Sequence, residues 1–157
     1  MNQLHPEWKD FLELLGSEKV DFVIVGGLAV AFHGRPRFTG DIDVFVRADK
    51  SNAERIMKVV ERFGFGSVGL KSDDFAAEGF TIQFGREPRR IDILTSITGV
   101  AFEAAYASKE IGTIDGLKVP FISRELLIKN KKETARHKDL GDVDTLERTR
   151  SRTKAKK

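Results

Sequence analysis

Cysteine is absent from the 157 residues, and so is any long apolar run. Without cysteine the chain has no disulfide framework and no thiolate for catalysis or metal binding. The longest uncharged apolar stretch, residues 22–32, is about half of what a membrane span needs. The first residues, MNQLHPEWKDF, lack the basic and then apolar pattern of a secretory signal. These absences predict a cytoplasmic protein with no membrane partner.

Excess charge of one sign is confined to the C-terminal end. The formal net charge is +3, from 27 Lys and Arg against 24 Asp and Glu, but residues 148–157, RTRSRTKAKK, carry six basic residues and no acid. Without them, 21 basic and 24 acidic residues leave a net charge of −3. We therefore predict a folded domain over 1–148 and a basic, disordered tail over 149–157. The tail is either a solubilising terminus or a contact for nucleic acid such as tRNA.

Short apolar runs alternate with helical patterns, which indicates a mixed α/β fold in one domain. The pattern predicts strands at 20–25, 41–47, 80–84, 90–95, 111–114 and 117–121. It predicts helices at 6–15, 28–33, 51–62, 100–107, 123–134 and 138–148. Ser51 and Ser123 are the expected N-caps of two of these helices, and Asp115-Gly116 predicts a tight hairpin.

Two aspartates interrupt the apolar strand DIDVFV. Side chains alternate along a strand, so Asp41 and Asp43 share one face while Ile42, Val44 and Val46 form the core face. Neighbouring carboxylates repel each other and lose hydration when they are buried, and a divalent cation such as Mg²⁺ removes both costs. The simpler alternative is an exposed strand end.

A second strand repeats the pattern, and a glycine pair precedes both. In RIDIL, Ile91 and Ile93 face the core, so Asp92 joins the first two aspartates if the strands are neighbours; three carboxylates could hold one or two metal ions. Gly26-Gly27 lies between a strand and a helix, where free N–H groups and the helix dipole favour a phosphate. A tight turn without a ligand is the alternative. Together, these features indicate phosphoryl or nucleotidyl transfer.

The segment GGLAVAFHGRPRFTGDIDVFV resembles the signature of the polymerase β-type nucleotidyltransferase superfamily. RFTGDID, residues 37–43, is similar to a form common in its small standalone prokaryotic branch, the minimal or AbiEii-like nucleotidyltransferases. The C-terminal segment LLIKNKKETARHKDLGDVDTLE also resembles that branch, so the likeness spans about 20–148. The chain departs from the signature at Gly27, where serine is common.

The resemblance implies a mixed β-sheet flanked by helices, with further helices at the C-terminus. It implies that Gly26 and Gly27 bind nucleotide phosphates and that Asp41 and Asp43 coordinate Mg²⁺, with Mn²⁺ as an alternative. Asp92 would also bind the metal and activate the acceptor hydroxyl. The implied reaction moves a nucleoside monophosphate from an NTP, with ATP among the candidates, and releases pyrophosphate. A protein side chain, a tRNA end and a small molecule all remain open as acceptors.

Three further residues are candidates for contacting the nucleotide. Thr39 belongs to the matching motif, and Arg37 and Lys131 could neutralise the triphosphate, although a surface role is equally open for these two. A helical protein partner or a homodimer is expected, because the chain has no obvious acceptor-binding domain. The alternatives to an enzyme are a binding protein or toxin–antitoxin component with little turnover, and a basic-tailed nucleic-acid-binding module.

Overall fold

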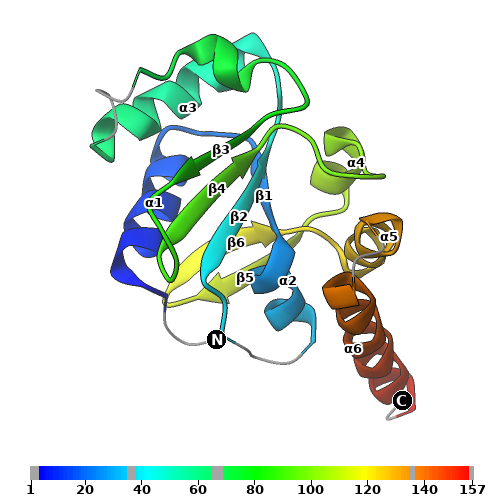
Figure 1. Cartoon of the computed structure of the whole chain (residues 1–157). Helices are drawn as coiled ribbons and strands as arrows, with labels where there is room; N and C mark the ends of the chain where they lie inside the picture. Colours follow the sequence, from blue (N-terminus) through cyan, green and yellow to red (C-terminus); the bar gives the residue numbers. More distant parts are fainter. Residues whose placement is uncertain (1–3, 35–37, 65–68, 135–136, 156–157) are drawn as a thin grey trace.

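Six strands form one mixed sheet in the order β3-β4-β2-β1-β6-β5 (Figure 1). The computed structural model describes residues 4–34, 38–64, 69–134 and 137–155, with side chains over the same ranges except 137–138 and 149–155. β2 pairs with β4 and β1 with β6 in parallel, while the other neighbours are antiparallel. The expected α/β class is confirmed. The strands are β1 (Phe22–Val25), β2 (Asp41–Val46), β3 (Thr81–Phe84), β4 (Arg90–Leu94), β5 (Glu110–Ile114) and β6 (Leu117–Phe121).

Helices cover both faces of the sheet (Figure 1). One face carries α1 (Pro6–Ser17) and α3 (Lys50–Arg62), which pack against each other. The other carries α2 (Gly26–His33), α4 (Phe102–Ala107), α5 (Arg124–Thr134) and α6 (His137–Ala155), and α2 contacts both α5 and α6. A 3₁₀ turn, η1 (Ser72–Phe75), packs on α3 and was not predicted, because one short turn leaves no helical period to recognise.

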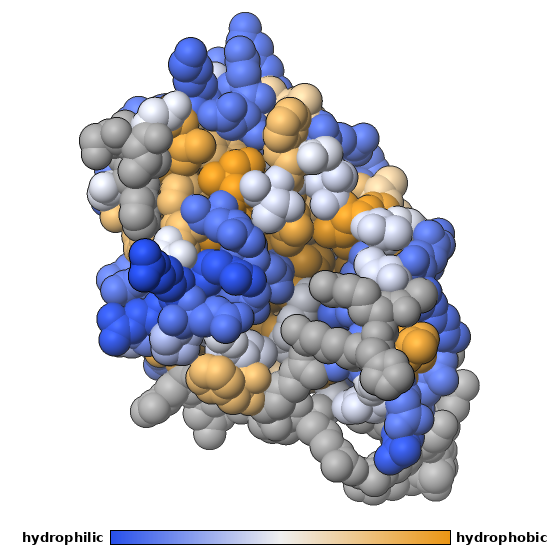
Figure 2. Space-filling model, viewed as in Figure 1, coloured by the Kyte–Doolittle hydropathy of each residue, from blue (hydrophilic) through white to orange (hydrophobic). Residues whose placement is uncertain are grey.

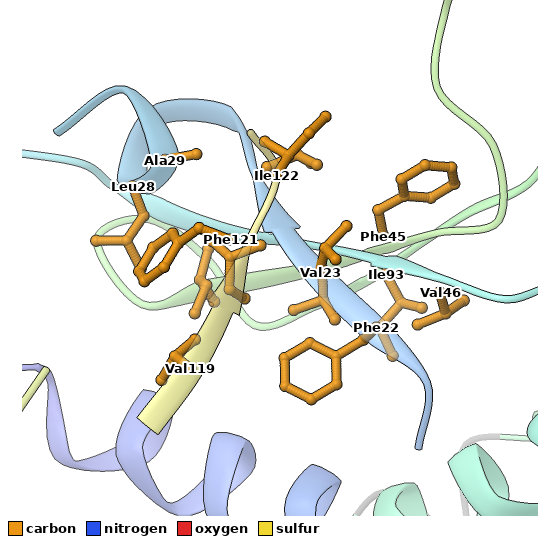
Figure 3. Packing of buried hydrophobic residues seen from close by; sticks show 14 of the residues in the cluster. Phe22, Val23, Leu28, Ala29, Phe45, Val46, Ile93, Val119, Phe121 and Ile122 are labelled. Carbon is orange, nitrogen blue, oxygen red and sulfur yellow. The ribbon is translucent and has the colours of Figure 1, made fainter. Parts of the chain in front are cut away.

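The core is built around β1, which is buried on both faces along its whole length. This explains why β1 is a continuous apolar run and not an alternating one. Figure 3 shows Phe22 and Val23 of β1 packed among side chains of neighbouring strands. On the α2 side, the ring of Phe32 stacks on Phe121 with centroids 4.1 Å apart. Gly112 leaves room for this stack, since a Cβ there would lie 2.4 Å from the Phe32 ring.

The N-cap of α3 is Asp49, and the prediction of Ser51 was wrong. The Asp49 Oδ1 accepts a hydrogen bond of 2.7 Å from the Asn52 N–H. Ser51 lies within the first turn, where its Oγ accepts from Arg55. Both residue types are good caps, so only the place where the chain leaves β2 decides between them.

The last helix is longer than expected. Its backbone is helical to Ala155, whereas the sequence predicted an end at Arg148 and disorder beyond. Lys and Arg are good helix formers and no Gly or Pro interrupts the segment after Gly141, so the helix can continue. Residues 156–157 lie outside the described residues. Within the described chain, no helix combines the length and the apolar character that crossing a membrane requires.

We expect Asp49→Ala to lower the free energy of unfolding by about 1 kcal/mol, because the Asn52 N–H loses its cap. Ser51→Ala, two residues further along the same helix, is the matched control and should cost less than half of that. Urea denaturation followed by circular dichroism measures both. If Ser51→Ala lowered the free energy of unfolding more than Asp49→Ala, Ser51 would be the N-cap after all.

Candidate active site

The parallel pairing of β2 and β4 brings the three predicted metal-binding carboxylates close together. Asp43 lies opposite Asp92 in the register, and Asp41 lies opposite Arg90. Since alternate residues of a strand share a face, the three aspartates project to the same side of the sheet. One carboxylate oxygen from each lies within 4.8 Å of the others. The structure therefore brings together all three residues that the sequence proposed as metal ligands.

This crowding changes the protonation of the carboxyls. Burial, and then the negative charges of Asp41 and Asp92, raise the pKa of Asp43 to about 7. Burial also raises the pKa of Asp92, although the Arg90 guanidinium opposes the change. A divalent cation between the three carboxylates would remove both their repulsion and their cost of dehydration. The donor set, carboxylate oxygens alone, suits a hard ion such as Mg²⁺ or Mn²⁺.

Arg90 is a site residue that the sequence analysis missed. Its Nη2 donates to Asp41 Oδ2 at 2.6 Å, and its Nε donates to Asp92 Oδ1 at 3.1 Å. The signal was available: Arg90 stands two residues before Asp92 in the same strand and must share its face. At the start of a predicted strand, an arginine is easily assigned to the preceding turn.

Gly26 lies against the carboxylates at the first turn of α2. Its φ of +67° is unfavourable for any residue with a Cβ. A Cβ built there would lie 2.0 Å from Asp43 Oδ2 and 3.0 Å from Asp43 Cβ. Glycine is thus required twice, by the backbone angle and by the close approach of β2. The N-terminus of α2 is thereby placed directly beside the acidic cluster.

A cavity of about 870 Å³ opens over these residues. Gly26, Gly27, Thr39 and Lys131 all line it, so the structure brings these predicted nucleotide contacts to the carboxylates. Figure 2 shows this face, with hydrophilic side chains on the side of the β3–β4 hairpin and hydrophobic ones across its centre. The remaining candidate, Arg37, lies outside the described residues. Its neighbour Phe38 is 82% exposed and also lines the cavity.

Lys131 is buried, which excludes the surface role that the sequence left open. Its Nζ lies 3.3 Å from both Asp139 Oδ1 and Asp142 Oδ2, which belong to α6. Asp139 also accepts a hydrogen bond of 2.6 Å from the Thr134 hydroxyl. The pairing of α5 with α6 therefore holds a lysine at the wall of the cavity, where its charge opposes the rise in the pKa of Asp43.

A family model described as "Nucleotidyl transferase of unknown function (DUF2204)" matches residues 7–156. The chain therefore belongs to this family, which confirms the expected enzyme class, a nucleotidyltransferase, and the resemblance to its minimal branch. A comparison with curated proteins finds no match.

Three solved structures share the fold. The lincosamide antibiotic adenylyltransferase LnuA, solved with lincomycin, is 17% identical with a TM-score of 0.59, covering 94% of this chain and 98% of that one. A candidate nucleotidyltransferase from Thermotoga maritima is 19% identical with a TM-score of 0.56 and covers 98% and 97%. An antigenic nucleotidyltransferase-like protein from Paracoccidioides brasiliensis is 17% identical with a TM-score of 0.56 and covers 91% and 74%. At these identities the likeness establishes the fold alone.

We expect Gly26→Ala to destabilise the fold by roughly 2–4 kcal/mol and to weaken Mn²⁺ binding, because the new Cβ strains the backbone and pushes the Asp43 carboxylate away. Gly16→Ala in α1 is the control, since its Cβ would meet nothing within 4 Å. Thermal melts and Mn²⁺ titration calorimetry measure the two effects. Wild-type Mn²⁺ affinity in Gly26→Ala would show that the close approach is not needed.

The raised pKa of Asp43 predicts how stability depends on pH without metal. Folding moves this pKa from 3.8 to about 7, so the folded state holds the proton more tightly than the unfolded chain. The resulting contribution is complete below about pH 4 and is lost as the pH rises through about 7. In EDTA, the melting temperature should therefore fall from pH 5 to pH 8, and Asp43→Asn should reduce that fall.

The exposed Asp10 of α1 supplies the control, because Asp10→Asn should keep the wild-type pH profile. Melting curves followed by circular dichroism at half-unit pH steps are sufficient. An Asp43→Asn profile parallel to that of the wild type would contradict the assignment.

Proposed function

We propose that this nucleotidyltransferase moves a nucleoside monophosphate from an NTP to an acceptor hydroxyl, with a divalent cation, most simply Mg²⁺, and with release of pyrophosphate. One observation carries the proposal: three carboxylates with oxygens within 4.8 Å of one another line a cavity beside the first turn of α2. Neither the acidic cluster nor the helix terminus would be sufficient alone. Their combination places groups for metal and for phosphate at one site.

Different residues of the site would bind the cation and the triphosphate. Asp41, Asp43 and Asp92 would hold the cation, which neutralises phosphate charge and lowers the pKa of a bound hydroxyl. Gly26 and Gly27 let the triphosphate approach the N-terminus of α2, whose free N–H groups and positive dipole end favour phosphate oxygens. Most of the rate enhancement then comes from positioning and charge compensation.

We assign removal of the acceptor's proton to Asp92, the role that the resemblance implies for the third carboxylate. It is 5% exposed, and burial raises its pKa, so it is a stronger base than an ordinary aspartate. The hydroxyl oxygen forms a bond to the α-phosphorus as its proton passes to the Asp92 carboxylate. The bond from the α-phosphorus to the bridging oxygen breaks, and pyrophosphate leaves with that electron pair.

The size of the cavity bears on the acceptor. About 870 Å³ is near the upper end for small-molecule sites and leaves room for part of an acceptor beside a nucleotide. A small-molecule hydroxyl, a protein side chain and a tRNA end remain the candidates, and a helical partner or a second copy of the chain could present the acceptor. The retention of all three carboxylates favours turnover over a role in binding alone.

We expect Asp92→Asn to bind NTP in the presence of Mg²⁺ within a few-fold of the wild type and to lose roughly 10²–10⁴ in turnover, because proton removal and metal orientation are both impaired. Each α-³²P-labelled NTP is incubated with protein, Mg²⁺ and cell extract, and the labelled fraction is identified. Asp43→Asn should abolish labelling, and Asp10→Asn is the matched surface control.

Labelling at the wild-type rate by Asp92→Asn would remove this residue from the chemistry. If the wild-type protein labels no fraction with any NTP, even with its natural partner present, the binding alternative would replace the enzymatic one.

A further inference from the structure

Arg90 contacts two of the three carboxylates that a metal ion would need. Its guanidinium bridges Asp41 and Asp92, one from each strand, at 2.6 and 3.1 Å. These are two of the three carboxylates that converge within 4.8 Å. A guanidinium and a divalent cation seek the same oxygen atoms and repel each other at short distance. A cation bound between these carboxylates would therefore compete with the Arg90 bridge.

Lys131, the other basic residue on the cavity wall, is held in place by its own acidic partners. Among the described residues that line the cavity, the basic ones are Arg90 and Lys131. Lys131 is buried and paired with two aspartates of α6. Arg90, by contrast, has a side chain that is 29% exposed, and it faces an open volume of about 870 Å³. Its guanidinium can leave the carboxylates without leaving the site.

We propose that Arg90 is a displaceable counter-charge: it compensates Asp41 and Asp92 in the metal-free protein, releases them to the divalent cation, and then binds the phosphates of the NTP. This inference rests on the proposed function and adds a residue to it. The planar fork that bridges two carboxylates also suits two phosphate oxygens, which a lysine would contact only as a point charge. Exchange of partners keeps the guanidinium paired in both states, so neither state leaves its charge uncompensated.

The test separates the two states by measuring metal and nucleotide binding, not activity. Calorimetry with Mn²⁺ alone, on EDTA-treated and dialysed protein, measures the first. Arg90→Gln should bind Mn²⁺ about fivefold to tenfold more tightly than the wild type, because a competing and repelling charge is gone. Titration with α,β-methylene-ATP and Mg²⁺ measures the second, and there Arg90→Gln should bind about tenfold to a hundredfold more weakly.

The neighbouring arginine provides a matched control. The Arg89 side chain is 59% exposed and its nearest acidic partner is Glu7, at 3.8 Å. Arg89→Gln removes the same charge one residue away and should change neither affinity by more than about twofold. Arg90→Lys keeps the charge but not the fork, and it should fall between the wild type and Arg90→Gln in both titrations. It also serves if Arg90→Gln does not fold, as judged by circular dichroism.

Each result decides between the alternatives. Weaker Mn²⁺ binding in Arg90→Gln would show that Arg90 only holds the carboxylates in place, and the proposal would be wrong. Unchanged nucleotide affinity in Arg90→Gln would equally overturn it. Failure of the proposed function would give a different result. The wild-type protein would then bind no Mn²⁺ at this site, so Asp43→Asn would not change the Mn²⁺ titration.

Discussion

Parallel pairing between β2 and β4 places Asp43 beside Asp92, and the structure around them reflects the cost of that contact. Like charges at this distance repel, and partial burial weakens the hydration that would otherwise compensate them. Two basic side chains nearby compensate part of this negative charge: Arg90 from the same sheet and Lys131 from α5. Such a cluster does not stabilise the fold by itself, which supports the proposal that the three carboxylates hold a cation.

The same constraint explains features that lie further away. Because β2 and the first turn of α2 meet at Asp43, only glycine fits at Gly26. Because Lys131 is buried, it needs carboxylates, and α6 supplies Asp139 and Asp142. The C-terminal helix is thus tied to the cavity through a network of buried charges. Its packing and the electrostatics of the site depend on each other.

The alternation of side chains along β2 serves both the core and the site. Along β2, the residues that alternate with the aspartates are fully buried in the core, and at the end of the aspartate face Phe45 packs against the Phe102 ring of α4. The strand is therefore apolar at its far end and open to the cavity at its start. The end of β2 packs in the core, and its start carries Asp41 and Asp43. The carboxylates therefore stand on a rigid support.

Much of this could be read from local patterns. The period of two in DIDVFV and RIDIL was sufficient to place Asp41 and Asp43 on one face of their strand and Asp92 on the non-core face of its own, because alternation is a property of any strand. The apolar run of β1 and the hairpin at Asp115-Gly116 were equally local, and the resemblance supplied the family. Failures occurred where two local solutions are equivalent. Asp49 and Ser51 are both good caps, and a helix that could end at Arg148 can also continue through a segment without Gly or Pro.

The sequence by itself determined which residue types face the same side of each strand and which glycines can precede a helix, since both follow from the geometry of one or two residues. Tertiary structure alone decided that β4 pairs in parallel beside β2, with Arg90 across from Asp41. It also decided that one lysine within the polar segment KNKK is buried against α6. Such contacts join segments far apart in the chain, so their energy depends on the packing of the whole fold, and no local pattern records it.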